Sequence, residues 1–128
     1  MARILVAEDE EALRLLVTRA LMQAGHDVTA APDGAEALEH LTRASGRFDL
    51  LLADVKMPVM DGIALALAAA RDHPDLIILL MTGYADQRER AHGLDALIHD
   101  VIVKPFTPAE ICATVAQALA GAAKLPPA

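Results

Sequence analysis

Short runs of apolar residues alternate along the chain with segments in which apolar residues recur every three or four positions. Buried parallel strands have continuous apolar runs, whereas amphipathic helices have the three-to-four-residue spacing. The pattern therefore predicts that strands and helices alternate over the whole chain. The runs assigned to strands are residues 4–7, 26–31, 50–53, 76–81 and 101–103.

The helices expected between and after these strands are marked by turn and capping signals. They lie at residues 13–21, 35–41, 63–73, 85–93 and 108–120. Gly25 and Pro74 follow the ends of the first and third helices. The last helix has the clearest start, because Thr107 and Glu110 form a capping-box pattern around Pro108. In the Ala/Leu-rich third helix, one side is expected in the core and Leu65 on the outer side.

Five strand–helix units with short connections predict an α/β fold, a doubly wound five-stranded parallel sheet with helices on both faces. The flavodoxin-like strand order 2-1-3-4-5 would place the first and third strands side by side at the switch point. Functional residues in such sheets gather outside the carboxyl ends of the strands. We expect one domain over residues 1–121, followed by a short tail over residues 122–128 with no output domain.

Composition and charge narrow the possible functions. The net charge of −7 and the presence of only one Tyr and two Phe argue against nucleic acid as a partner. The longest apolar run, residues 76–81, is too short to cross a membrane, and no secretory signal precedes Glu8, so a cytoplasmic protein is expected. The single cysteine, Cys112, cannot form an internal disulfide.

Five polar residues stand where strands are expected to end: the carboxylates Glu8, Asp9 and Asp54, the hydroxyl of Thr82 and the ammonium of Lys104. The carboxyl ends of parallel strands meet at one edge of a sheet, so these side chains should converge. Three close carboxylates repel one another, and a divalent cation that prefers oxygen ligands, such as Mg²⁺, would relieve that repulsion. The group suits a metal ion and a phosphoryl group.

Four motifs in this order resemble those of the receiver domain of bacterial two-component response regulators, which includes the chemotaxis regulator CheY. They are Glu8-Asp9, Asp54 with Met57-Pro58-x-Met60-Asp61-Gly62 behind it, Thr82-Gly83, and Lys104-Pro105-Phe106. The resemblance covers about residues 2–120. The overall pattern also resembles short stand-alone regulators of alphaproteobacteria, among them the proteolysis-adaptor regulator CpdR.

The resemblance implies a function for the acidic residues. Asp54 would accept a phosphoryl group from the phosphohistidine of a histidine kinase or a histidine phosphotransfer protein. Asp9, Asp54 and the backbone carbonyl of Lys56 would bind Mg²⁺ directly. Glu8, which stands where the family often has Asp, would act through a metal-bound water. Lys56 itself is expected over the mouth of the pocket, where it would prolong the phosphorylated state; a solvated loop lysine is an equally good interpretation.

The resemblance also implies a switch. Lys104 would pair with Asp54 before transfer and with the phosphoryl oxygens afterwards, and Thr82 would move inward to bind the phosphoryl group. Many receivers have Tyr or Phe three residues before the lysine, but Val101 stands here, and a β-branched side chain has no ring to swing. Tyr84 is the nearby aromatic that would substitute, although an exposed surface ring is its more common role. Lys104-Pro105 is expected to be a cis peptide bond.

Simpler and competing interpretations remain open. Glu8-Asp9 could cap the following helix, and Lys104-Pro105 could be a surface turn. A receiver that signals to an unknown effector by protein–protein contact is favoured over a relay intermediate or phosphate sink. A Mg²⁺-dependent aspartyl phosphohydrolase is disfavoured, because such enzymes need a second Asp where Lys56 stands. The protein is therefore not expected to be an enzyme.

Overall fold

The computed structural model describes residues 2–43, 47–83 and 96–124. Within these ranges the chain forms five strands and four helices. Their bounds are β1 (Arg3–Ala7), α1 (Glu11–Gln23), β2 (Asp27–Ala31), α2 (Gly34–Arg43), β3 (Leu50–Asp54), α3 (Gly62–Asp72), β4 (Ile77–Thr82), β5 (Asp100–Val103) and α5 (Pro108–Lys124). The helix expected at residues 85–93 lies outside the described ranges.

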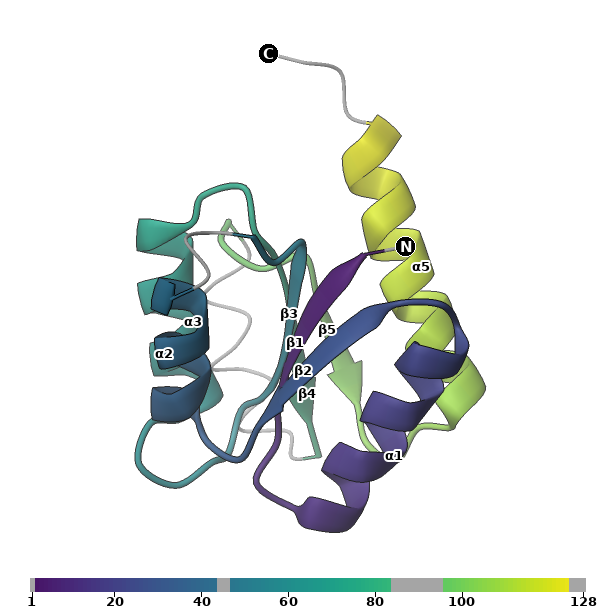
Figure 1. Cartoon of the computed structure of the whole chain (residues 1–128), viewed down its shortest axis with the longest axis horizontal. Coiled ribbons are helices and arrows are strands. Elements are labelled where there is room, and N and C mark those ends of the chain that lie inside the picture. Colours follow the sequence, from purple (N-terminus) through teal and green to yellow (C-terminus); the bar gives the residue numbers. More distant parts are fainter. Residues whose placement is uncertain (1, 44–46, 84–95, 125–128) are drawn as a thin grey trace.

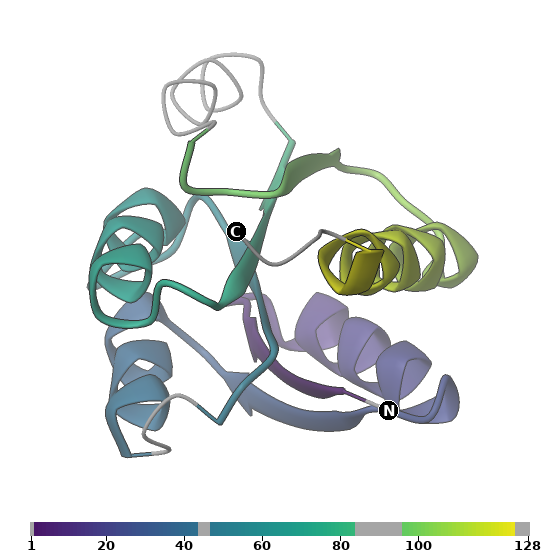
Figure 2. The ribbon, with the colours of Figure 1, turned by 90° about the horizontal axis from the view of Figure 1, so that it is seen from above.

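The strands form one parallel sheet in the order β2-β1-β3-β4-β5, which confirms the predicted α/β fold and strand order. Helices α1 and α5 cover one face of this sheet, and α2 and α3 cover the other (Figures 1 and 2). The sheet is therefore buried on both faces, which explains why its central strands have continuous apolar runs rather than alternating ones.

Successive residues of each central strand pack into different apolar layers. In β1, Ile4 belongs to the layer under α1 and α5, whereas Leu5 belongs to the layer under α2 and α3. Leu50 and Leu51 of β3 divide in the same way. Because both layers are closely packed, the five strands are held in fixed register, and the residues that follow them are held with them.

Two glycines bring the loop after β3 against the body of the domain. The Gly62 N–H donates to the Val55 carbonyl (2.9 Å), and a Cβ added at Gly62 would overlap the Asp54 carbonyl. The Gly34 N–H donates to the Met60 carbonyl (3.2 Å), where an added Cβ would also overlap. The loop that follows Asp54 is therefore fixed at both the β3 and the α2 side.

Three predictions about local structure have clear outcomes. The capping box at α5 is confirmed, because the Thr107 N–H donates to Glu110 Oε1 and the Glu110 N–H donates to Thr107 Oγ1, each at 3.1 Å. The expected end of this helix near Ala120 is wrong, since α5 continues past Gly121, a poor helix former, through two alanines to Lys124. The expected outer position of Leu65 is also wrong: this side chain is fully buried between α3 and the sheet, and the exposed leucine of α3 is Leu67.

Candidate functional site

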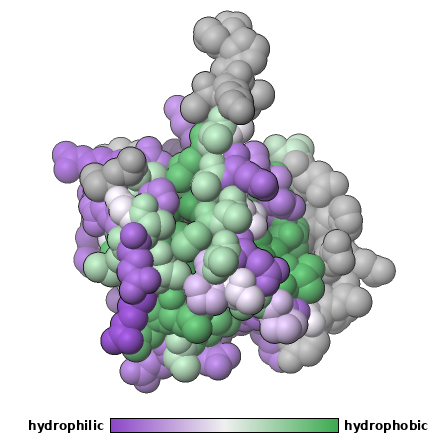
Figure 3. All heavy atoms as spheres, turned by 90° about the vertical axis from the view of Figure 1, so that its right-hand side faces the viewer, coloured by the Kyte–Doolittle hydropathy of each residue, from purple (hydrophilic) through white to green (hydrophobic). Residues whose placement is uncertain are grey.

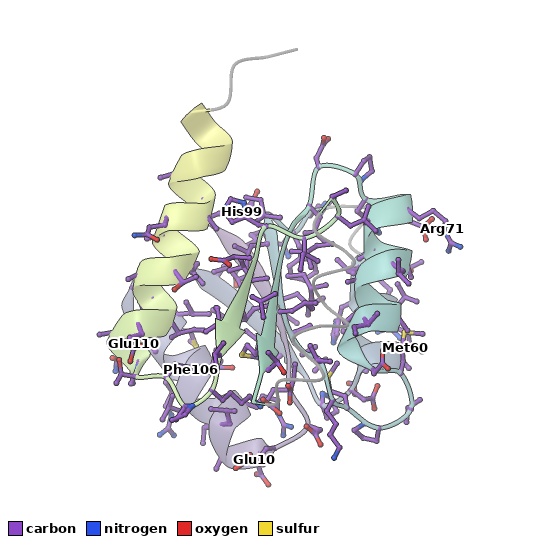
Figure 4. All side chains as sticks on the ribbon, turned by 180° about the vertical axis from the view of Figure 1, so that it is seen from behind. Glu10, Met60, Arg71, His99, Phe106 and Glu110 are labelled. Atoms are coloured by element: carbon purple, nitrogen blue, oxygen red, sulfur yellow. The ribbon has the colours of Figure 1, made fainter. Side chains whose placement is uncertain are left out.

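A cleft of about 950 Å³ lies at the carboxyl end of the strands. It is bounded by the loops that follow β1, β3, β4 and β5. Figure 4 shows Glu10, one of its lining residues, at this end of the sheet and His99 at the opposite end. The residues that line the cleft are Glu8, Asp9, Glu10, Asp54, Lys56, Met57, Pro58, Gly83, Lys104 and Pro105.

Three carboxylates converge in this cleft, as the sequence predicts. One oxygen atom from each of Glu8, Asp9 and Asp54 lies within 4.8 Å of the other two. The strand register accounts for this, because Ala7 pairs with Ala53 and the residues after this pair are neighbours. Glu8 and Asp54 are buried, whereas Asp9 is exposed to the cleft.

Lys104 bridges two of the carboxylates. Its Nζ donates to Asp54 Oδ2 at 2.9 Å and to Glu8 Oε1 at 3.1 Å. Its backbone N–H donates to the Thr82 carbonyl at 2.8 Å, which ties the lysine to the end of β4. The Lys104-Pro105 peptide bond is cis, as expected. The predicted pairing of Lys104 with Asp54 is confirmed, and the contact with Glu8 was not predicted.

Burial and charge shift the pKa values of two residues in this cluster. Burial raises the pKa of Glu8 from 4.5 to about 7; the Glu10 N–H opposes this shift, and the Asp54 charge adds to it. Burial alone would lower the pKa of Lys104, but the hydrogen bond and charge of Asp54, together with the charge of Glu8, raise it above its ordinary value. The lysine is therefore an ammonium at neutral pH, and Glu8 holds a proton over part of the acidic-to-neutral range.

The turn between β1 and α1 is held by hydrogen bonds around Glu8. Its N–H donates to the Ala31 carbonyl (3.1 Å), and its Oε2 accepts from the Glu10 N–H (3.0 Å). Its carbonyl accepts from Arg14 Nη1 (3.0 Å). The N-cap of α1 is Glu10, which makes no side-chain cap hydrogen bond in the described structure. The Glu8 side chain therefore binds the N–H of the N-cap residue of this helix, and it also belongs to the carboxylate cluster of the cleft.

The predicted switch residues occupy different surroundings. Thr82 ends β4, pairs with Val103 in the sheet and is buried, and Gly83 after it lines the cleft. Val101 is half-buried and packs against the apolar layer under α2 and α3. Tyr84 lies outside the described residues.

Lys56 is exposed and lines the cleft with Met57 and Pro58. These residues belong to the loop after β3, in which the Met60 N–H donates to the Pro58 carbonyl at 2.7 Å. Nothing in the sequence pattern marked Arg14 as part of the site, because a single arginine in an amphipathic helix is typical of a solvated face. Its importance is visible only from the folded turn.

The donor set indicates which kind of metal ion fits here. All three clustered side chains offer carboxylate oxygens, and the partly open cleft leaves room for water. Mg²⁺ prefers oxygen ligands and usually keeps several waters, so these residues fit it well. Of the helices in the described ranges, none combines the length and apolar character that crossing a membrane requires.

The chain belongs to the response regulator receiver domain family, which it matches over residues 4–116. It is 47% identical over 85 residues to the response regulator receiver protein CpdR of Brucella abortus, covering 66% of this chain and 69% of CpdR. It is 37% identical over 119 residues to the sensor kinase CckA of the same organism, covering 92% of this chain but 12% of the kinase. The response regulator MprA of Mycobacterium ulcerans is 41% identical over 87% of this chain and 47% of MprA.

Solved structures agree with this assignment. The chemotaxis protein CheY4 of Vibrio cholerae superposes with a TM-score of 0.82 at 32% identity, covering 92% of this chain and 98% of CheY4. A receiver domain protein of Clostridium thermocellum gives a TM-score of 0.86 at 22% identity, covering 94% of this chain and 96% of that one, which supports the fold alone. The chain thus spans most of CpdR and CheY4, but about half of MprA and about an eighth of CckA.

Proposed function

We propose that this protein is a phosphorylation switch in two-component signalling and that Asp54 is its phosphoacceptor. The observation that carries the proposal is the Lys104 ammonium, 2.9 Å from an oxygen of the buried Asp54 within a group of three carboxylates. The phosphoryl donor is a histidine kinase or a histidine phosphotransfer protein. The similarity to regulators such as CpdR, and to part of the sensor kinase CckA, supports this class of partner.

In the proposed reaction, an Asp54 carboxylate oxygen attacks the phosphorus of a phosphohistidine. A bond between oxygen and phosphorus forms, and the bond between phosphorus and the imidazole nitrogen breaks, leaving its electron pair on that nitrogen. Lys104 pairs with the Asp54 carboxylate before transfer and with the negatively charged phosphoryl oxygens afterwards, and the Thr82 hydroxyl donates a hydrogen bond to a phosphoryl oxygen. Phosphoryl transfer depends mainly on such positioning and charge stabilisation, so no further covalent partner is needed.

We assign Mg²⁺ binding to Asp9, Asp54 and the backbone carbonyl of Lys56, with Glu8 acting through a water. Both oxygens of Glu8 already accept hydrogen bonds, from the Glu10 N–H and from Lys104 Nζ, which supports an indirect role for Glu8. Asp9 is the exposed carboxylate of the three and is the best placed to bind directly. When bound, Mg²⁺ supplies positive charge against the carboxylates and the incoming phosphoryl group.

The output of the switch is proposed to be protein–protein contact by the receiver domain over residues 1–121, without catalytic activity of its own and acting in the cytoplasm. The movement of Thr82 toward the phosphoryl group would change the surface around the ends of β4 and β5. Val101 packs against the core and has no ring that could change position when Thr82 moves. We therefore propose that another side chain in this part of the sequence moves with Thr82, and Tyr84 is the candidate.

Phosphoramidate, whose phosphorus–nitrogen bond resembles that of phosphohistidine, tests the proposed acceptor. Wild-type protein incubated with it and Mg²⁺ should gain one phosphoryl group by intact-mass spectrometry, and incubation with EDTA should prevent this. Asp54→Asn should gain none. Asp75→Asn, an exposed aspartate variant, is the matched control and should gain one. Equal labelling of Asp54→Asn and wild type would refute the proposal.

A second experiment separates a switch from a relay or phosphate sink. Beryllofluoride, a phosphoryl mimic, is added to the wild-type protein, and proteins captured from a lysate of the source cells are compared with and without it. A switch should capture an effector only with beryllofluoride, and Asp54→Asn should remove this dependence. Identical capture under both conditions would favour the relay or sink.

A further inference from the structure

Arg14 is a side chain from outside the acidic turn that binds its main chain. It lies in α1, and its Nη1 donates to the Glu8 carbonyl at 3.0 Å. The neighbouring anchors of the turn come from other groups: the Ala31 carbonyl accepts the Glu8 N–H, and Glu8 Oε2 accepts the Glu10 N–H. Figure 4 shows Glu10 at the end of the sheet where this turn lies.

The Glu8 carbonyl is part of the peptide that joins Glu8 to Asp9, so its direction sets the orientation of that peptide. Asp9 lies between two anchored residues, and its exposed carboxylate is 4.8 Å or less from oxygens of Glu8 and Asp54. Rotation of this peptide would turn Asp9 away from Asp54. The Arg14 hydrogen bond opposes that rotation from outside the carboxylate group.

The charge of Arg14 would act in the opposite direction. Residues 8–11 are four consecutive acids, and an arginine beside them repels an incoming cation while it attracts the carboxylates. A role in charge alone therefore predicts that removing Arg14 strengthens cation binding. A role in holding the turn predicts that removing it weakens cation binding. Whether removal of Arg14 raises or lowers the affinity for Mg²⁺ therefore distinguishes the two roles.

We propose that Arg14 is a positioning residue for the metal site, which holds the Glu8–Asp9 peptide so that the Asp9 carboxylate faces Asp54. The inference rests on the proposed function, because it concerns the affinity of that site for Mg²⁺. Groups that orient metal ligands through hydrogen bonds typically alter metal affinity when they are removed. Removal of a group that bonds a metal ligand directly typically weakens metal binding about 10- to 100-fold. Arg14 acts through a backbone carbonyl one residue away from the ligand, so its removal should weaken Mg²⁺ binding by less than this.

Isothermal titration with Mg²⁺ tests the inference without any phosphorylation. Arg14→Met removes the donor and the charge, and it should raise the dissociation constant about 3- to 10-fold. Arg14→Lys restores both a donor and a charge and should recover most of the affinity. Arg19→Met is the matched control, since it removes an exposed arginine from the same helix. It should alter the affinity by less than about twofold at physiological salt.

Several outcomes would overturn the role of Arg14. Normal Mg²⁺ binding by wild type with equal or tighter binding by Arg14→Met would show that charge outweighs positioning. Arg14→Lys as weak as Arg14→Met would show that a restored donor has no effect. Melting in EDTA identifies a variant that binds weakly because it is unfolded, in which case Arg14→Leu, which also removes the donor and the charge, replaces it under the same criterion. Absence of Mg²⁺ binding by wild type would instead refute the proposed metal site itself.

Discussion

In the absence of metal, the protein should lose stability as the pH rises through the titration of Glu8, and Glu8→Gln should remove this loss. Glu8 is fully buried, and burial raises its pKa to about 7, with the charge of Asp54 acting in the same direction. Gln at this position does not titrate, but it keeps an oxygen that accepts from the Glu10 N–H. The comparison therefore isolates the cost of ionising one buried carboxyl.

The sign follows from proton linkage. Between pH 4.5, the ordinary pKa, and about 7, the folded protein keeps a proton that the unfolded chain has released. This contribution to stability is complete below the lower value and is lost as the pH rises through the higher one. A shift of this size corresponds to about 3 kcal/mol in total, of which about 2 kcal/mol lies between roughly pH 5.5 and 8.5. The Lys104 pKa is raised, so the lysine stays protonated over this range.

Urea unfolding followed by circular dichroism suits this test, since the chain has no tryptophan. The free energy of unfolding is measured in EDTA at several values between pH 5.5 and 8.5 for wild type and Glu8→Gln. The wild type should fall by about 2 kcal/mol relative to the variant, and excess Mg²⁺ should flatten the wild-type curve. Parallel curves in EDTA would refute the argument that Glu8 is ionised at a cost in the buried cluster.

Three further predictions concern the metal, the cleft mouth and the core. Mg²⁺ at about 10 to 100 times its dissociation constant should stabilise wild type by roughly 1–3 kcal/mol in thermal melts, and Asp9→Ala should abolish this stabilisation. A wild-type melting temperature that does not change with Mg²⁺ would contradict the metal site. Lys56→Ala should dephosphorylate about fivefold faster if the lysine contributes ~1 kcal/mol to the phosphorylated state, and an unchanged rate would leave it a surface residue. Leu65→Ala should cost about 2–5 kcal/mol of stability by urea unfolding, whereas exposed Leu67→Ala should cost less than about 1; equal losses would refute the assignment of the buried face of α3.

The central strands were predictable because a sheet that is buried on both faces leaves a strong signal in the sequence, and their order followed from the usual topology of doubly wound sheets. Runs such as residues 50–53 have few other stable environments in a chain of this length. Helix ends were less predictable, because Gly121 is a common stop signal but is accommodated within α5. The position of Leu65 was missed since helical spacing alone does not show which of two leucine-bearing sides faces the sheet.

The candidate site was predictable in its residues but not in its contacts. Strand ends placed Glu8, Asp9, Asp54 and Lys104 at one edge, and the structure brings the three carboxylates within 4.8 Å of one another. The lysine contact with Glu8 and the Arg14 contact with the turn depend on side-chain reach and on backbone direction after the strand ends. The spacing of residues along the sequence predicts neither the reach of a side chain nor the direction of the backbone after a strand.

The surface over α1 and α5 is mixed in character. Figure 3 looks onto the side formed by α1 and α5, where hydrophobic and hydrophilic surfaces adjoin. The exposed large apolar residues of α1 are Leu15, Leu16 and Met22. Because these side chains do not line the cleft, substitutions there should leave Mg²⁺ affinity unchanged and are suitable background controls for the metal measurements.

Chemical trapping of the phosphorylated residue identifies the phosphoacceptor itself. An aspartyl phosphate is reduced by borohydride to homoserine, so the acceptor is read as a mass change at one position. Wild-type protein is treated with phosphoramidate and Mg²⁺, reduced, digested and sequenced by mass spectrometry. If Asp54 is the phosphoacceptor, homoserine should appear at position 54 and at no other aspartate. Homoserine at Asp9 or elsewhere, with Asp54 unmodified, would contradict it.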